Sequence, residues 1–288
     1  MTAIVLVQDH VPASAAPAGW VARLELGFER EASRSVLAAR RHVGPLRVQK
    51  PLYPEGADVC QVIVVHPPGG IVAGDSLRIE VDAGERAHAQ LTTPGAAKWY
   101  RSAGPIACSD TVLRAREGAL VEWLPQETLL FDGARATIRL RVELAGDARF
   151  IGWDVTTLGR TASGERFESG CMRQTIELLR NGTIHWCECM VLDGGSGALQ
   201  SGAILSGAPV FGTLIASGGD VDGGVLAACR GASPVSGEGA VTRLPGVLIA
   251  RYRGDSAHAA RTYFATLWRV LRPALAGREA VMPRIWST

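Results

Sequence analysis

The stretch Ile138-Arg-Leu-Arg-Val-Glu-Leu144 alternates apolar and charged side chains. Successive side chains of an extended chain point to opposite faces, so this pattern predicts a strand with one buried and one solvated face. The same alternation recurs in Leu77-Arg-Ile-Glu-Val-Asp82 and in Thr111-Val-Leu-Arg-Ala-Arg116. Turn-forming residues separate such stretches at residues 67–70, 117–118, 132–133, 145–147 and 181–182. We therefore predict a succession of short strands.

The dipeptide Asn181-Gly182 is the most specific local signal, and it lies between residues 173–180 and 183–192. Asn and Gly tolerate the positive φ angles that a two-residue hairpin turn requires, so we predict a hairpin here. The 34 glycines and the lack of helical patterns between the strands favour a mainly-β protein over repeated β-α-β units. Periodicity alone leaves a sandwich, a barrel and a coil of strands open.

The pattern changes near the C-terminus, where apolar residues recur at three- and four-residue steps. They are Ala260, Tyr263, Phe264, Leu267, Trp268 and Leu271. This spacing places them on one face of a helix that Asp255 or Ser256 can cap and that Pro273 is expected to end. We expect the aromatic face of this helix to pack on a sheet.

Residues 1–18 end in an Ala/Pro-rich stretch with little to bury, and we expect a loosely ordered arm there. The rest of the chain is long enough to form a sizeable core without disulfide or metal cross-links, in one domain or two. Six scattered cysteines without a CxxC pair agree with this expectation. Gln8 and Asp9 follow a short apolar run without a basic leader, which is untypical of a signal peptide. We therefore expect a cytoplasmic protein.

The charge balance bears on the kind of partner. Thirty basic and 28 acidic residues give a formal net charge of +2, which disfavours nucleic acid and an anionic membrane as partners. Charged residues make up 20% of the chain, against roughly 25% in an average domain, and such a surface favours a protein partner. Residues 194–219 carry no charge at all. This segment is either a buried strand pair or a protein-docking surface.

Signatures of common catalytic and cofactor sites are missing from the sequence. The glycine-rich segment 67–75 lacks the Gly-Lys-Ser/Thr ending of a phosphate-binding loop, and no Gly-x-Ser-x-Gly elbow presents a serine nucleophile. His185, Cys187 and Cys189 alternate along one predicted strand and therefore share a face. They are either soft metal ligands or, as is commoner in strands, small buried apolar residues.

Six carboxylates lie near turns that contain Gly, Pro or Trp: Asp75, Glu122, Glu127, Asp132, Asp154 and Glu165. If two of them flanked one glycosidic bond, a mainly-β chain could be a carbohydrate-active enzyme. The sequence does not show that any two converge. This enzyme class is therefore kept as the alternative function.

Six ordered segments carry a more specific signal. They are Gly44-Pro-Leu-Arg-Val-Gln-Lys-Pro-Leu-Tyr-Pro-Glu55, Pro67-Pro-Gly-Gly-Ile-Val-Ala-Gly-Asp75, Leu91-Thr-Thr-Pro-Gly-Ala-Ala-Lys-Trp-Tyr-Arg-Ser102, Glu122-Trp-Leu-Pro-Gln-Glu-Thr-Leu-Leu-Phe-Asp-Gly-Ala-Arg135, Leu158-Gly-Arg-Thr-Ala-Ser-Gly-Glu165 and Pro283-Arg-Ile-Trp286. In order and composition they resemble the motifs of the urease accessory protein family UreD, also called UreH, from about residue 20 to the end. Ala73 stands where the family usually has glycine, which affects only the local turn.

The resemblance implies a single mainly-β domain over residues 19–288, with many short strands in a superhelical, β-helix-like arrangement and one or two helices near the C-terminus. It implies a scaffold without catalytic activity that helps to incorporate nickel into apo-urease. It also implies binding to urease and to UreF, which recruits the GTPase UreG, in a heteromeric complex that can hold two copies of this chain.

The nickel role suggests weak binding along a path. Carboxylates and water hold a divalent ion more weakly than clusters of Cys and His do. We therefore expect a transit route for Ni²⁺ rather than a tightly bound cofactor, with His66 and some of the six carboxylates along it. A stand-alone metal-storage protein, the third hypothesis, would instead bind nickel tightly and stoichiometrically without partners.

Overall fold

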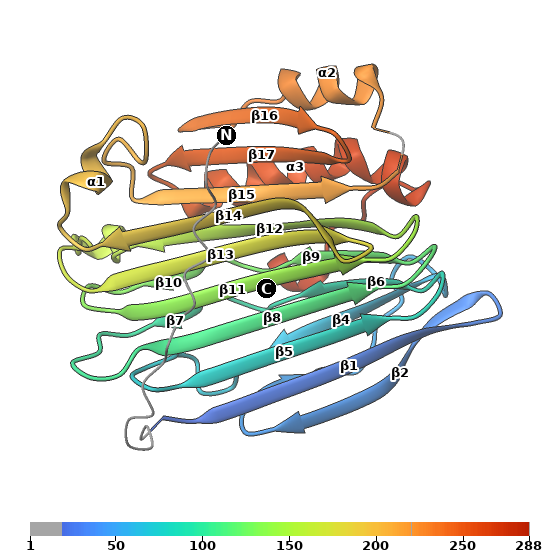
Figure 1. Cartoon of the computed structure of the whole chain (residues 1–288), viewed down its shortest axis with the longest axis horizontal. Coiled ribbons are helices and arrows are strands. Elements are labelled where there is room, and N and C mark those ends of the chain that lie inside the picture. Colours follow the sequence, from blue (N-terminus) through green and yellow to red (C-terminus); the bar gives the residue numbers. More distant parts are fainter. Residues whose placement is uncertain (1–18, 220, 288) are drawn as a thin grey trace.

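The computed structural model describes residues 19–219 and 221–287 (Figure 1). The arm predicted at residues 1–18 lies outside them. Within the described residues the strands form two sheets. The seven-stranded sheet runs, in spatial order, through β14 (Thr183–Asp193), β13 (Cys171–Arg180), β11 (Arg135–Leu144), β8 (Ala107–Ala115), β5 (Ser76–Ala83), β1 (Val21–Glu31) and β2 (Arg34–Val43).

The second sheet has ten strands within the described residues. Its main path runs through β16 (Glu238–Leu244), β17 (Val247–Gly254), β15 (Val210–Ser217), β12 (Arg149–Leu158), β9 (Leu120–Leu124), β6 (His88–Thr92), β4 (Val59–Val65) and β3 (Arg47–Val48), with β10 (Thr128–Leu130) and β7 (Ala97–Trp99) beside it. The helical elements are η1 (Thr161–Ser163), α1 (Gly197–Gln200), α2 (Gly223–Gly231), α3 (Ala257–Ala276) and η2 (Arg284–Ser287).

The chain coils between the two sheets. β5 leads to β6, β8 to β9 and β11 to β12, so a strand of one sheet is followed by a strand of the other. Strands of successive turns then pair in parallel, as in the series β5, β8, β11 and β13. Parallel pairs need a long crossover, which is usually a helix. Here a strand of the opposite sheet provides it, which confirms the predicted superhelical, mainly-β arrangement.

The predicted local elements are present. The alternating stretches 77–82, 111–116 and 138–144 lie in or at the ends of β5, β8 and β11. Strands β13 and β14 form the predicted antiparallel hairpin. Its turn residues Asn181 and Gly182 have φ angles of 50° and 78°. Asn and Gly tolerate this region because their steric cost there is low.

Helix α3 begins where the sequence predicts. The Ser256 hydroxyl accepts a hydrogen bond from the Ala259 N–H at 3.2 Å. The prediction that Pro273 ends the helix was wrong, because α3 continues to Ala276. A proline removes one N–H donor, yet the last turn is held by buried Leu275 and by the Gly277 N–H, which donates to the Pro273 carbonyl at 2.9 Å.

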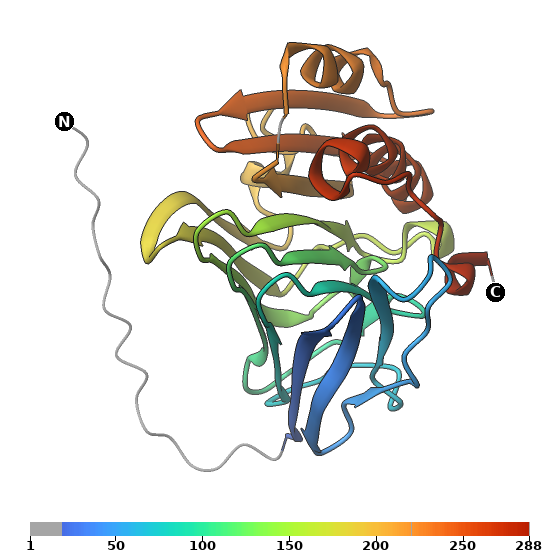
Figure 2. The same cartoon turned by 90° about the vertical axis from the view of Figure 1, so that its right-hand side faces the viewer.

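Helix α3 lies against the ten-stranded sheet (Figure 2). Its aromatic face packs on this sheet, as predicted. Trp153 of β12 lies against Phe264, with ring centroids 6.4 Å apart. The terminal motif residue Trp286 packs against both Trp153 and Trp268. Its indole N–H donates to the Thr92 hydroxyl at 2.8 Å. The C-terminal motif therefore fixes the end of the chain to the sheet and to α3.

The uncharged segment 194–219 contains the short helix α1, turns and the fully buried strand β15. The hypothesis of a buried strand pair is therefore wrong in detail, because one strand rather than two lies there. Glycine and serine residues at 194–209 form turns instead of a second strand. No helix in residues 19–219 and 221–287 has the length and apolar character needed to cross a membrane.

Candidate functional site

The segments before β5, β8, β11 and β13 lie at one end of the seven-stranded sheet, because these strands are parallel neighbours (Figure 1). We call residues 66–75, 99–106, 131–134 and 159–170 the motif end, since four of the six sequence motifs reach it. Backbone hydrogen bonds connect its segments. The Ser102 N–H donates to the Gly133 carbonyl, and the Gly133 N–H donates to the Ser169 carbonyl, both at 3.0 Å.

Asp132 organises the motif end. Its Oδ1 accepts hydrogen bonds from the N–H groups of Glu168 and Ser169, at 3.0 and 2.8 Å, and from the Ser169 hydroxyl at 3.0 Å. Arg101 donates to its Oδ2 at 2.7 Å. Partial burial raises the pKa of Asp132, but the hydrogen bonds from Ser169, Glu168 and Arg101 outweigh it and lower the pKa. Asp132 is thus an ionised acid that already has its partners.

Glu165 lies next to Asp132, as the sequence order alone could not show. Its Oε1 accepts from the Asp132 N–H at 3.1 Å, and its Oε2 accepts from Arg160 at 2.6 Å. The hydrogen bond from Arg160 lowers the pKa of Glu165. Arg160 also lies over the Phe131 ring, 4.6 Å from its centroid. Asp132 and Glu165 therefore hold loops together and leave few lone pairs for a metal ion.

Asp75 also has a structural contact on each oxygen. It accepts from the Trp20 N–H at 2.8 Å and from the Val72 N–H at 2.9 Å. These bonds join the segment before β1 to the segment before β5. Burial lowers the pKa of the nearby His66, while the charge of Asp75 opposes this shift. His66 therefore favours a neutral imidazole, which is the form that binds metal ions.

A cavity of about 360 Å³ lies between the two sheets and is lined by residues of both, including His66 and Asp154. Its wall is mostly apolar, with Trp99 and Trp123 among the lining residues. Asp154 accepts hydrogen bonds from the Gln174 amide and, at 3.2 Å, from the Thr156 hydroxyl. Burial raises the pKa of Asp154 in spite of these bonds. No cationic side chain bonds to this carboxylate within the described residues.

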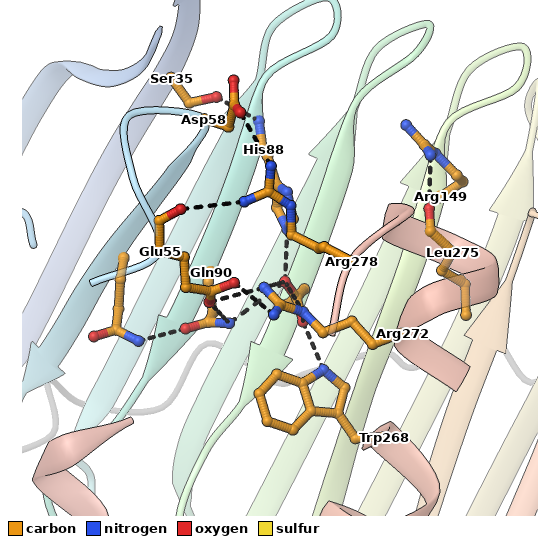
Figure 3. A network of polar contacts seen from close by, with 12 residues as sticks. Ser35, Glu55, Asp58, His88, Gln90, Arg149, Trp268, Arg272, Leu275 and Arg278 are labelled. Carbon is orange, nitrogen blue, oxygen red and sulfur yellow. Dashed lines mark hydrogen bonds and ion pairs between the residues drawn. The ribbon is translucent and has the colours of Figure 1, made fainter. Parts of the chain in front are cut away.

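Glu122 belongs to a buried charge network beneath α3. Figure 3 labels the other members, His88, Trp268, Arg272 and Glu55. His88 Nε2 lies 2.6 Å from its Oε1, and the Trp268 indole N–H donates to its Oε2 at 2.6 Å. Arg272 donates to Glu122 at 3.0 Å and to Glu55 at 2.6 Å. We call these five residues the α3 network. It fastens α3 to β6, β9 and the segment that follows β3.

The α3 network is closed to ions from outside, since Glu122 and Arg272 are fully buried. Burial raises the pKa of Glu122, but the hydrogen bond and charge of His88 and the guanidinium of Arg272 outweigh it and hold the pKa at about 2. Glu127, the neighbouring candidate, faces Arg261, with Oε2 and Nε 3.1 Å apart. Both candidates are therefore paired with arginine side chains.

The sulfur ligands predicted as an alternative do not form a cluster. Cys187 and Cys189 alternate along β14 and are both exposed. A β-bulge, where Leu178 pairs with Trp186 and Leu179 with Ile184, leaves His185 out of this alternation, contrary to the prediction of a shared face. Alternate residues of a strand lie about 6.6 Å apart along it, which is too far for three side chains to meet easily on one ion. Among residues 19–219 and 221–287 no group of three or more His, Cys, Asp and Glu residues is placed to hold a metal.

The seven transit candidates thus divide into separate places. His66 and Asp154 share the cavity, Asp75, Asp132 and Glu165 hold the motif end, and Glu122 and Glu127 pair with arginines. The sequence reasoning missed Arg272, His88 and Glu55. A signal for Arg272 exists, because it follows Trp268 by four residues and so continues the apolar face of the helix. A charge on such a face predicts a buried partner.

The model of the family described as UreD urease accessory protein matches residues 21–287. The chain belongs to this family. A protein of Azoarcus sp. (strain BH72) named urease accessory protein UreD is 50% identical over 282 residues, which cover 98% of this chain and 99% of the relative. The UreD family name describes an accessory protein rather than an enzyme, as the sequence predicts.

Two further relatives extend the match to other bacteria. The urease accessory protein UreD of Dechloromonas aromatica (strain RCB) is 52% identical over 273 residues, covering 93% of this chain and 95% of the relative. That of Pseudomonas aeruginosa (strain PAO1) is 52% identical over 270 residues, with the same coverage. Membership of the UreD family therefore rests on nearly the whole chain and not on isolated motifs.

Proposed function

We propose that this chain is a cytoplasmic urease accessory protein that helps to incorporate nickel into apo-urease and connects urease to UreF and, through UreF, to the GTPase UreG. The observation that carries this proposal is the family match over residues 21–287, together with full-length relatives named urease accessory protein UreD. A rigid coil of strands with loops gathered at one end suits a scaffold, because it holds several contact segments in fixed positions.

The alternative of a carbohydrate-active enzyme finds little support in the geometry. Such an enzyme needs two carboxyl groups that face one open substrate site. Glu55 and Glu122 do converge, but both bind Arg272, and the side chains of all three are almost completely buried. Asp132 and Glu165 are neighbours as well, yet backbone N–H groups and arginines occupy their oxygens. The geometry therefore favours the accessory role.

For the path of Ni²⁺ we propose the cavity between the sheets, with His66 and Asp154 as weak ligands. The other five candidates already have cationic or backbone partners, which leaves His66 and Asp154. Asp154 can release a proton to gain a cation, because burial rather than a fixed positive charge governs its pKa. Two ligands in a mostly apolar wall would hold a hydrated ion only weakly. Weak binding suits an ion that must dissociate again to reach urease.

Coexpression tests both the accessory function and the proposed nickel route through the cavity. Urease subunits and the other accessory proteins are produced with this chain, without it, or with the double variant His66→Ala and Asp154→Asn. We expect nickel content and activity of purified urease to fall severalfold without the chain and with the double variant. The matched control combines His185→Ala with Asp193→Asn, at two exposed positions of β14, and is expected to behave as the unmodified chain.

The outcomes separate the two claims. If urease loads equally well without the chain, the accessory function is wrong. If the chain is required but the double variant still forms the complex and supports full nickel loading, the transit route through the cavity is wrong and the scaffold role stands. Copurification with UreF and urease, measured for each variant, shows whether the complex has formed and how many copies of the chain it contains.

A further inference from the structure

A second cavity, of about 550 Å³, lies at the end of the sheets opposite the motif end. The turns after β1, β5 and β8 and the end of α3 form its wall. Four arginines line it from four separate segments: Arg30, Arg86, Arg149 and Arg278. Asp58 is the one acidic residue among the described residues that line it. We call this the arginine pocket.

The contacts within the arginine pocket leave positive charge without a counterion. Arg30 and Arg278 share Asp58, at 2.7 and 3.0 Å. Arg149 donates to two backbone carbonyls, those of Leu275 at 2.6 Å and Gly118 at 3.0 Å, so no acid balances it (Figure 3). The four arginines and Asp58 therefore give the lining three positive charges in excess.

Arg86 is the most available of the four arginines. Its side chain is exposed, and within the described residues it has no hydrogen bond or ion pair to a side chain. The neighbouring acid Asp147 is turned to the backbone, where it accepts from the Gly118 N–H at 2.5 Å, and it does not line the pocket. Like charges repel one another, so such a cluster costs free energy unless an anion joins it.

We propose that the arginine pocket binds a small anion with a phosphate or pyrophosphate group. A guanidinium presents N–H groups in a planar fork that matches two oxygens of such an anion, and charge-assisted bonds of this kind are the strong ones. The excess of three charges favours an anion that carries more than one. A volume of about 550 Å³ exceeds what a single phosphate fills and suits a small organic ligand that carries the group.

The ligand would also connect the turns to α3. His88 lines the arginine pocket and at the same time pairs with Glu122 in the α3 network. Ala276 and Arg278, at and just after the end of α3, line the pocket as well. An anion bound there would bridge the β turns and the end of α3, so ligand binding would raise the thermal stability of the whole chain.

Pyrophosphate is the probe for this site. Binding to the purified full chain is measured by isothermal titration calorimetry and by the shift in Tm, at low and at high salt. We expect saturable binding that weakens with added salt, because exposed charges are screened. Arg86→Ala is expected to weaken binding roughly tenfold, since one charge-assisted bond is lost. Arg116→Ala is the matched control, on the turn after β8 but outside the pocket.

A second variant tests the charge without removing an arginine. Ala32 lines the pocket with a φ of 51°, a region in which Asp is tolerated better than Ala. Ala32→Asp should keep the fold and abolish pyrophosphate binding by adding a carboxylate. Inorganic phosphate and citrate, titrated in parallel, distinguish recognition of the phosphate group from recognition of any multivalent anion. Absence of saturable pyrophosphate binding would overturn the proposal. So would binding by Arg86→Ala and Ala32→Asp that is as tight as binding by the unmodified chain.

Discussion

Asp154 places its carboxylate at the wall of the cavity between the sheets, with Gln174 and Thr156 as hydrogen-bond donors. Burial raises the pKa of this acid, which means that the folded protein disfavours the ionised form. A side chain that costs stability and has no cationic partner is typical of a functional position. The same reasoning does not apply to Asp132 or Glu165, whose pKa values are lowered by their partners.

Asp154→Asn is therefore expected to stabilise the protein while it impairs nickel loading. The asparagine oxygen can still accept from Gln174, and the buried negative charge is gone. We expect Tm at neutral pH to rise by a few degrees, and the rise to shrink as the pH falls toward the raised pKa, where the native Asp154 takes up a proton. Thermal unfolding of the unmodified protein and of Asp154→Asn, from neutral pH downward, measures the difference in Tm. A lower Tm for the variant at neutral pH would contradict the assignment.

The α3 network shows how one helix depends on buried charge. Glu122→Ala leaves the Arg272 guanidinium buried with Glu55 as its remaining acid, and breaking a buried pair in this way costs about 3–5 kcal/mol. We expect urea unfolding of the variant to show a loss of this size. Arg114→Ala, which removes ion pairs on the solvated face of β8, is the control and should cost about 1 kcal/mol or less. Equal losses for the two variants would contradict the role of the network.

The same network predicts the response to acid. The pKa of Glu122 is held at about 2, below its ordinary value of 4.5. A lowered pKa means that the unfolded chain takes up the proton first, so the contribution of Glu122 is complete above pH 4.5 and is lost as the pH falls from there to about 2. Glu122→Gln, which cannot ionise, should lose less stability over this interval. If the free energy of unfolding fell equally with pH in Glu122→Gln and in the unmodified protein, this prediction would be contradicted.

The β13–β14 hairpin depends on its turn. Gly182 has a φ of 78°, and a Cβ added there would meet no atom within 4 Å. Gly182→Ala therefore tests backbone strain alone, and we expect a loss of about 1–2 kcal/mol in the free energy of unfolding. Gly197→Ala, at a helical glycine that also has open space around it, is the control and should be neutral or slightly stabilising.

At the scale of elements, the sequence predicts those strands, turns and helix starts that depend on neighbouring residues. Alternation predicted the strands 77–82, 111–116 and 138–144, Asn181-Gly182 predicted the hairpin, and Ser256 predicted the start of α3. The predicted end of α3 at Pro273 was wrong because Leu275 is held by tertiary packing, which no local sequence pattern shows. Residues 194–209 gave no strand because their glycines and serines favour turns.

The candidate site was predicted less completely, for a physical reason. Residue type and nearness to turns predict seven ligands, and the structure distributes them over separate places. Whether an oxygen is free depends on partners far away in sequence, as for Glu122 and Arg272, which are 150 positions apart. No single-sequence pattern reports such pairs. The cavity that joins His66 to Asp154 likewise exists only because two sheets face each other.

At the scale of the whole molecule, the coil of parallel strands separates two ends. The motif end carries loops that are bound to one another by Asp132 and Glu165, and the opposite end carries the arginine pocket. The cavity with His66 and Asp154 lies between the sheets. A coil of strands with loops gathered at one end suits a scaffold that positions partners.

The nickel content of urease tests this scaffold role most directly. Urease purified from cells that contain the other accessory proteins is compared with and without this chain, and nickel is counted per active site by elemental analysis. We expect nearly complete loading with the chain and severalfold lower loading, with a parallel loss of activity, without it. Equal nickel content in the two preparations would contradict the proposed function.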